Sequence, residues 1–276
     1  MTTMTHTHTI EYTLDGLPEL TVNNHRGDIR VVHDAGPGQI RVTLTSNQPA
    51  DFEAVDSRAD GNRVTVTIPR LPADGSPGFS FSLGSFSLAL GGGLAVDVDV
   101  HCPPEASVSV DTRQGGIRVD GRGGRTTART GAGDIAVESS ESAVISTGAG
   151  DIRLARAGAA SLNTGAGDVS VEDCTGRLEI RTGTGDIHVG SSHGELSIVS
   201  GAGDVHAVVD GGSAEVRTGM GDLTIQVPTT VAVWQDLSTG VGEVRSRVPS
   251  HGEPAPGEPY IKVAARTGAG DVNLTV

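Results

Sequence analysis

The stretch Arg177-Leu-Glu-Ile-Arg-Thr-Gly-Thr-Gly-Asp-Ile-His-Val189 contains the pattern that decides the fold. Leu178 and Ile180 alternate with charged residues before the two glycines, and Ile187 and Val189 alternate with a polar residue after them. This period of two is typical of a strand with one buried face. Glycine reaches positive φ at little steric cost, so the Gly-Thr-Gly segment predicts a sharp turn. The stretch therefore predicts two short strands joined by a tight turn.

Nearly the same five residues, Ser/Thr-Gly-x-Gly-Asp, occur six times between Thr130 and Asp222. The aspartates are 17, 17, 18, 18 and 18 residues apart, at Asp134, Asp151, Asp168, Asp186, Asp204 and Asp222. Self-similarity at a fixed period indicates a repeat architecture. Because one pair of strands cannot bury its own apolar face, neighbouring copies must stack at about 4.8 Å. We predict an all-β fold: a β-solenoid with two short strands per 17–18-residue turn and irregular β caps at both ends.

Weaker copies of the motif flank the regular repeats. A degenerate copy lies at Leu20–Val31, and a last full copy, Thr267-Gly-Ala-Gly-Asp271, follows a proline-rich stretch. We therefore predict four segments along the chain. They are a disordered tail at 1–9, an N-terminal β segment with the degenerate repeat and a Phe-rich hairpin at 10–111, the regular solenoid at 112–248, and a proline-rich loop with a closing repeat at 249–276.

Stacking places the six repeat aspartates in one column. Like charges about 5 Å apart repel by ~1 kcal/mol in water, so we expect each carboxylate to accept backbone N–H groups of its own turn. Gly-x-Gly-Asp is also similar to part of the calcium-binding nonapeptide repeat. One carboxylate per turn supplies fewer oxygens than calcium prefers. A plain stacked turn is the favoured interpretation, and calcium binding by the column is the alternative.

The scarce aromatic residues gather between Gly78 and Gly91. Apolar residues there alternate with small ones on both sides of Gly84-Ser85, which predicts a β-hairpin with one apolar face. That face comprises Phe79, Phe81, Leu83, Phe86, Leu88 and Leu90. Two interpretations stay open. The face either covers the open end of the solenoid or forms a contact patch for self-association or a partner.

Residues capable of chemistry do not form a recognisable catalytic motif. Gly190-Ser-Ser-His-Gly194 fits the pattern Gly-x-Ser-x-Gly, but a nucleophile elbow requires a following helix, and no helical periodicity is present. His188 and His206 hold the same outward position one repeat apart, so we expect them to stack about 5 Å from each other. Their column supplies no third metal ligand. We predict a protein that is not an enzyme and needs no cofactor.

Composition narrows the class of partner. A formal net charge of −14 argues against nucleic acid and against anionic membranes. No apolar run approaches the length of a membrane span, and the N-terminus lacks the features of a secretory signal. Cys102 and Cys174 lie far apart and are expected as reduced thiols. We expect a cytoplasmic protein without membrane insertion.

The repeat resembles the β-strand-repeat family of bacterial adhesin-like proteins of unknown function. Two features carry the resemblance: the Ser/Thr-Gly-x-Gly-Asp-Ile/Val repeat, and the segment Val98-Asp-Val-His-Cys-Pro-Pro104 that leads into the first full repeat. It covers residues 20–276 and implies a β-solenoid without established catalytic residues. We expect an interaction scaffold that binds a protein partner or itself; any small-molecule ligand is unknown. The alternatives are a calcium-binding protein that uses the aspartate column, or a polymer built by end-to-end stacking.

Overall fold

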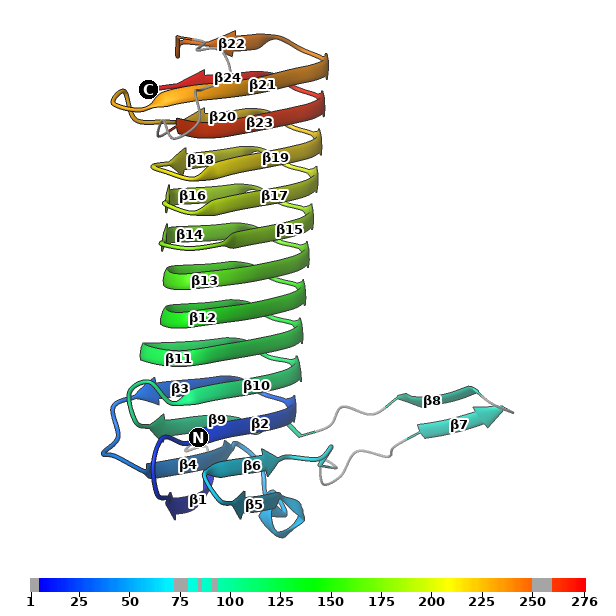
Figure 1. Ribbon diagram of the computed structural model, residues 1–276. Coiled ribbons are helices and arrows are strands. Elements are labelled where there is room, and N and C mark those ends of the chain that lie inside the picture. Colours follow the sequence, from blue (N-terminus) through cyan, green and yellow to red (C-terminus); the bar gives the residue numbers. More distant parts are fainter. Residues whose placement is uncertain (1–4, 72–78, 84–85, 91–93, 250–259) are drawn as a thin grey trace.

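The structure, a computed structural model, describes residues 5–71, 79–83, 86–90, 94–249 and 260–276. Its strands form a column of stacked turns (Figure 1). No helix in these ranges is long and apolar enough to cross a membrane. The strands are β1 (His6–Thr13), β2 (Glu19–Arg26), β3 (Ile29–His33), β4 (Gln39–Ser46), β5 (Asp56–Asp60), β6 (Arg63–Thr67), β7 (Phe79–Leu83), β8 (Phe86–Leu90), β9 (Asp97–Cys102), β10 (Ser107–Gln114), β11 (Ile117–Ala132), β12 (Ile135–Ala149), β13 (Ile152–Ala166), β14 (Val169–Cys174), β15 (Leu178–Thr184), β16 (Ile187–Ser192), β17 (Glu195–Ala202), β18 (Val205–Val209), β19 (Ser213–Met220), β20 (Leu223–Gln226), β21 (Ala232–Val241), β22 (Val244–Ser246), β23 (Tyr260–Ala269) and β24 (Val272–Thr275).

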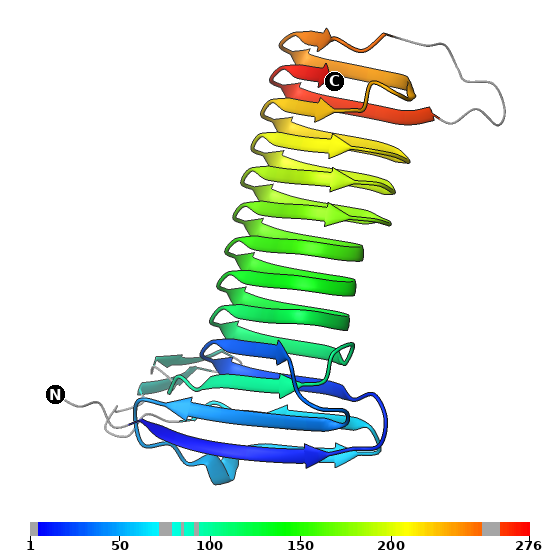
Figure 2. The same cartoon turned by 90° about the vertical axis from the view of Figure 1, so that its left-hand side faces the viewer.

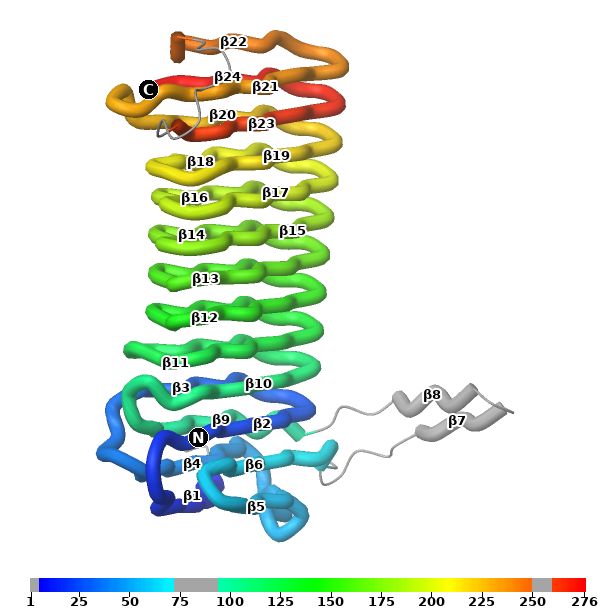
Figure 3. Tube along the Cα trace, viewed as in Figure 1, coloured from blue at the N-terminus to red at the C-terminus, as the bar shows by residue number. Residues whose placement is uncertain are grey.

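Corresponding positions of successive repeats pair in parallel. Ile135 pairs with Ile152 on one face of the stack, and Thr147 pairs with Thr164 on the other. We call the face that follows each Gly-Asp turn sheet I and the face that precedes it sheet II. The Cα trace shows these turns stacked with little change in outline from β11 to β19 (Figure 3).

The central turns differ from the expected pair of short strands. β11, β12 and β13 each run unbroken through both sheets and are 16, 15 and 15 residues long. Later turns are divided, for example into β14 and β15. Neighbouring turns form backbone hydrogen bonds on both sheets and around the corner between them. The parallel strand pairing therefore continues past the bend.

A thin aliphatic layer between the two sheets forms the core. Ile135 and Val137 of sheet I and Ala143 and Ile145 of sheet II are all buried. The same holds in later turns, where Leu178 is fully enclosed. The alternation in the sequence therefore assigns the inward positions correctly.

Stacking order departs from chain order at both ends. The degenerate repeat β2–β3 lies between strands that follow it in the sequence, since β2 pairs with β6 and β10, and β3 pairs with β9 and β11. At the other end β23–β24 lies between β19–β20 and β21–β22, visible as the red turn below the outermost orange one (Figure 2). The last copy in the sequence therefore does not close the stack as expected. The turn that carries Thr239–Glu243 does, because every copy offers the same pairing edge.

Antiparallel pairing is confined to the N-terminal segment among the parts of the stack that the structure describes. β1 pairs antiparallel with β4, β4 with β9, and β5 with β6. The expected disordered tail at 1–9 is wrong from His6 onward, because the Thr-rich start of β1 completes an eight-residue pairing with β4.

The backbone of β7 and β8 pairs antiparallel, with Phe79 opposite Leu90, in a sheet of its own. The side chains of the predicted apolar patch lie outside the described part of the chain. The choice between an end cap and a contact patch stays a prediction.

Candidate functional site

The repeat aspartates form a hydrogen-bonded column that we call the aspartate ladder. Asp134 Oδ1 accepts a hydrogen bond from the Asp151 N–H at 2.9 Å, and Asp151 Oδ1 accepts one from Asp168 at 3.0 Å. The ladder runs in space through Asp97, Asp28, Gly116, Asp134, Asp151, Asp168, Asp186, Asp204, Asp222, Asp271 and Glu243. Each aspartate carboxylate of the ladder thus binds the backbone of the adjacent turn.

This arrangement corrects the expected hydrogen bonds within one turn. Because parallel stacking brings the next N–H group directly over the carboxylate, the nearest donor belongs to the neighbour. Hydrogen bonds to charged acceptors are worth about 1.5–3 kcal/mol, which exceeds the ~1 kcal/mol repulsion between neighbouring carboxylates in water. The ladder therefore holds successive turns in register.

Calcium ligation by the column receives no positive support from this geometry. One oxygen of each stacked carboxylate already accepts an N–H group. The other oxygen of Asp151 binds Arg153 at 3.0 Å, and that of Asp271 binds Arg245 at 2.8 Å. Among the described residues, no three His, Cys, Asp or Glu side chains are grouped to hold a metal. Calcium prefers six to eight oxygens, and this geometry leaves at most one free carboxylate oxygen per turn. Calcium binding by the column stays a prediction.

Close packing at the turn accounts for its second glycine. Gly150 has φ +142°, and a Cβ there would lie 2.2 Å from the carbonyl oxygen of Gly133. The buried Thr147 hydroxyl donates to that same carbonyl at 3.0 Å. Glycine and threonine therefore serve the stacking of turns.

The Gly190–Gly194 segment is not arranged as a nucleophile elbow. Ser192, which would be its nucleophile, is fully buried. Its neighbour Ser191 lies 3.1 Å from His193 Nε2, and the same nitrogen lies 3.2 Å from Asp173. A catalytic imidazole must contact the hydroxyl and the carboxylate through different nitrogens. This cluster cannot pass a proton in that way.

The stacking of His188 on His206 is confirmed. The ring centroids are 5.2 Å apart and the planes differ by 5°. The lone pair of an imidazole lies in the ring plane, so those of parallel rings run side by side. The pair therefore does not converge on one metal ion.

Both cysteines are free and buried. Burial, with a further contribution from Asp34, raises the pKa of Cys102 to about 12. Burial also raises the pKa of Cys174. Reactivity requires the thiolate, so these thiols are unreactive in the folded state.

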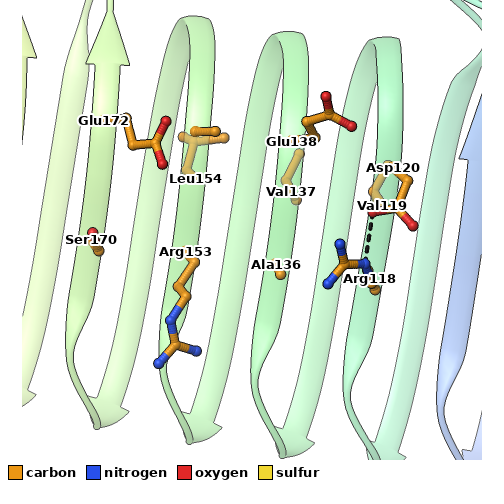
Figure 4. A pocket seen from close by; sticks show the side chains of 11 residues that line it. Arg118, Val119, Asp120, Ala136, Val137, Glu138, Arg153, Leu154, Ser170 and Glu172 are labelled. Atoms are coloured by element: carbon orange, nitrogen blue, oxygen red, sulfur yellow. Dashed lines mark hydrogen bonds and ion pairs between the residues drawn. The ribbon is translucent and has the colours of Figure 1, made fainter.

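A charged hollow interrupts the outward face of sheet I. Ala136 pairs with Arg118 on one side and with Arg153 on the other, so a methyl group lies between two long cationic side chains (Figure 4). The hollow has a volume of about 250 Å³. A second hollow of about 400 Å³ adjoins it across Arg118 and Ala136 and extends to Gly116 and Asp134. Together we call them the Ala136 hollow.

Ion pairs surround the Ala136 hollow. Arg118 binds Asp120 at 2.7 Å, and Arg30 binds the same carboxylate at 3.1 Å. Glu138 and Glu172 line the other side. The two arginines are more than half exposed, whereas the Asp120 side chain is only 17% exposed, so Asp120 keeps one ion pair when the other arginine exchanges its partner. Sequence reasoning missed this site; its signal was small residues at 116 and 136, where other repeats carry larger ones.

A family model and several solved structures match this chain. The family model described as Toastrack DUF4097 matches residues 17–275. A candidate adhesin from Bacteroides fragilis NCTC 9343 is 12% identical, with 98% of this chain and 97% of that chain covered and a TM-score of 0.47. A candidate adhesin from Parabacteroides distasonis ATCC 8503 is 10% identical, with 97% of each chain covered and a TM-score of 0.49. A candidate lipid binding protein from the same strain is 11% identical, with coverage of 97% and 96% and a TM-score of 0.44. No curated protein matches the chain.

Proposed function

The chain belongs to the Toastrack DUF4097 family, whose model spans nearly its whole length, and from that premise we propose that it is a non-enzymatic, adhesin-like interaction scaffold. In this proposal each turn contributes two faces, one to each sheet. The N-terminal β segment and the outermost C-terminal turn act as caps. The faces display side chains at the fixed spacing of the stack, and a protein partner binds one of them.

The observation that carries the proposal is the Ala136 hollow on an otherwise regular face. The turns that bear Arg118, Ala136 and Arg153 are held by parallel pairing on both sheets. The backbone positions that carry these side chains therefore keep a defined spacing before a partner arrives. Association costs side-chain and loop ordering, and a preorganised face avoids part of that cost.

Site-specific photo-crosslinking tests this proposal. A photoreactive residue at Ala136 is expected to capture one defined partner in cells that express the chain. The matched control is Val144, which is 38% exposed and lies on sheet II. Charge reversal at Arg118 and Arg153 should abolish the adduct at 136. The same adducts from both faces, or adducts that survive charge reversal, would contradict an interaction at this hollow.

End-to-end assembly is the second candidate, and one feature favours it. Among the described strands, β21 pairs only with β23, so its other edge is free. Val241 beside that edge is 74% exposed. Free edges with apolar side chains favour pairing with another chain. Light scattering over a range of concentrations, compared with Val241→Lys, tests this: assembly should rise with concentration only in the parent chain.

The cytoplasmic location and the calcium alternative stay predictions. Subcellular fractionation of the native host tests the first, and a predominantly envelope-bound chain would contradict it. Calorimetry of the metal-free protein with calcium tests the second, where specific binding that is lost in Asp168→Asn would favour a cation-binding role.

A further inference from the structure

We propose that the aspartate ladder is incomplete at Gly116 and that this position binds a carboxylate side chain of a protein partner. This inference extends the interaction role proposed above. It depends on that role only in taking the carboxylate to come from a protein partner. It concerns the part of the Ala136 hollow between Asp28 and Asp134.

The ladder lacks one hydrogen bond at this position. Asp28 Oδ1 accepts the Gly116 N–H at 2.8 Å, as the pattern requires. Gly116 itself has no carboxylate, so within the described part of the chain the Asp134 N–H has no acceptor equivalent to the one that the Asp151 N–H finds in Asp134 at 2.9 Å. Every other step from Asp97 to Glu243 has this bond, at 2.8–3.0 Å. Asp134, which carries this backbone donor, lines the hollow.

Arg118 lies two residues after Gly116, at the position from which an arginine can bind a ladder carboxylate. In two other turns an arginine two residues after the ladder acid binds that acid. Arg153 binds Asp151 at 3.0 Å, and Arg245 binds Glu243 and also, at 2.8 Å, Asp271 of the adjacent turn. Arg118 has the same offset from Gly116 but binds Asp120 instead. A carboxylate placed beside Gly116 would thus meet a backbone N–H and a guanidinium, which together favour an anionic acceptor.

The position also has room for side-chain atoms. A Cβ built on Gly116 would lie 3.4 Å from the carbonyl oxygen of Asp134 and 3.7 Å from Asp28 Oδ1, at ordinary contact distance. A Cβ on Gly133, in the turn itself, would lie 2.2 Å from the Gly115 oxygen. The hollow of about 400 Å³ opens over Gly116, so a partner's side chain can enter from solvent.

The surrounding charge selects the kind of anion. Asp28, Asp97, Asp99 and Asp134 line the same hollow. A single carboxylate between two ladder acids repeats the situation of every other step, where the N–H bond offsets the repulsion. The four carboxylates outnumber the two arginines of the hollow, Arg30 and Arg118, so a phosphate dianion would face about twice the net repulsion of a single carboxylate. The position is therefore expected to take an aspartate or glutamate side chain and not a phosphorylated residue.

Nuclear magnetic resonance on the full chain tests the inference. The probe is the capped peptide acetyl-Gly-Asp-Gly-amide, and the matched control is its Asn analogue. The Asp134 amide resonance should shift with the Asp peptide and respond at least about tenfold more weakly to the Asn peptide. Arg118→Gln should weaken binding by a similar factor. Gly116→Asp should abolish the response, because its own carboxylate then accepts the Asp134 N–H.

Three results would overturn the inference. One is no response of the Asp134 amide in the parent chain at any reachable peptide concentration. Another is a response of Arg118→Gln or Gly116→Asp that equals the response of the parent chain. Arg118→Gln alone still tests the inference if Gly116→Asp does not fold. A response to acetate but not to the peptide would reject a protein side chain as the source. Crosslinking at Ala136 does not require a carboxylate, so failure here is distinguishable from failure of the scaffold role.

Discussion

At the scale of single residues, Asp168 shows what a ladder carboxylate contributes. Its Oδ1 accepts the Asp186 N–H at 2.8 Å, while its own N–H donates to Asp151. One residue therefore links three consecutive turns, through its side chain on one side and its backbone N–H on the other. The aspartate was conspicuous in the sequence, but its acceptor role extends to the neighbour and not to its own turn.

Asp168→Ala is expected to lower the free energy of unfolding by about 1–3 kcal/mol, because it removes a charged acceptor from the Asp186 N–H. Asp168→Asn keeps an acceptor oxygen and should cost less. Urea denaturation of both variants measures the difference. Equal losses would mean that charge, and not the hydrogen bond, is the source of the stabilisation.

Gly116→Asp is expected to raise the free energy of unfolding by about 0.5–1 kcal/mol. The new carboxylate completes the ladder, and replacing glycine reduces the freedom of the unfolded chain. Gly116→Ala is the matched control, since it supplies only the second effect. A less stable aspartate variant, measured by urea denaturation, would show that repulsion from Asp28 and Asp134 exceeds the gain.

At the scale of the repeat element, the turn is a close contact between backbones. Gly167 has φ +143°, and its α-carbon faces the Gly150 carbonyl of the adjacent turn. Its neighbour Ala166 is exposed. The motif thus alternates positions that tolerate no side chain with one that points to solvent.

Gly167→Ala is expected to destabilise the fold by more than about 3 kcal/mol, because the new Cβ would lie 2.1 Å from the Gly150 oxygen and the backbone has positive φ. Ala166→Ser, one residue away, should change stability by less than about 0.5 kcal/mol. Thermal unfolding of the two variants checks the contrast. A tolerated Gly167→Ala would mean that the turns can separate at this corner.

At the scale of the whole molecule, His33 lies where the N-terminal segment joins the regular stack. It is buried, its Nδ1 is 3.0 Å from the Pro103 carbonyl oxygen, and Cys102 lies beside it at 3.4 Å. Burial lowers the pKa of His33, although the Pro103 carbonyl and Asp34 oppose that shift. The junction therefore favours the neutral imidazole.

Acidification is expected to weaken this junction. Below pH 6.5 the unfolded chain binds a proton at His33 that the folded state resists, so stability falls as pH decreases toward the lowered folded pKa. Above pH 6.5 His33 is neutral in both the folded and the unfolded chain, so it causes no loss of stability there. Denaturation at a series of pH values should show a smaller acid loss in His33→Gln than in the parent chain. Equal losses would assign the acid sensitivity to other groups.

Much of the fold was predictable because its information is local and repeated. Alternation assigned inward residues such as Ile180, and the 17–18-residue period placed the aspartates in a column. The family resemblance led to the same solenoid. The candidate site was not predictable, since a glycine at 116 or an alanine at 136 looks unremarkable until the neighbouring turns are placed beside it.

Repeat sequence by itself determined that the turns stack, and only the tertiary structure decided their order. Every copy carries the same pairing edge, so local sequence does not distinguish one neighbour from another. The pairing of the end segments fixes the stacking order. β2–β3 lies between strands that follow it in the sequence, and β23–β24 lies between β19–β20 and the outermost turn. The incomplete ladder position follows from that order, because Gly116 lies between Asp28 and Asp134 only when the degenerate repeat is inserted beside it.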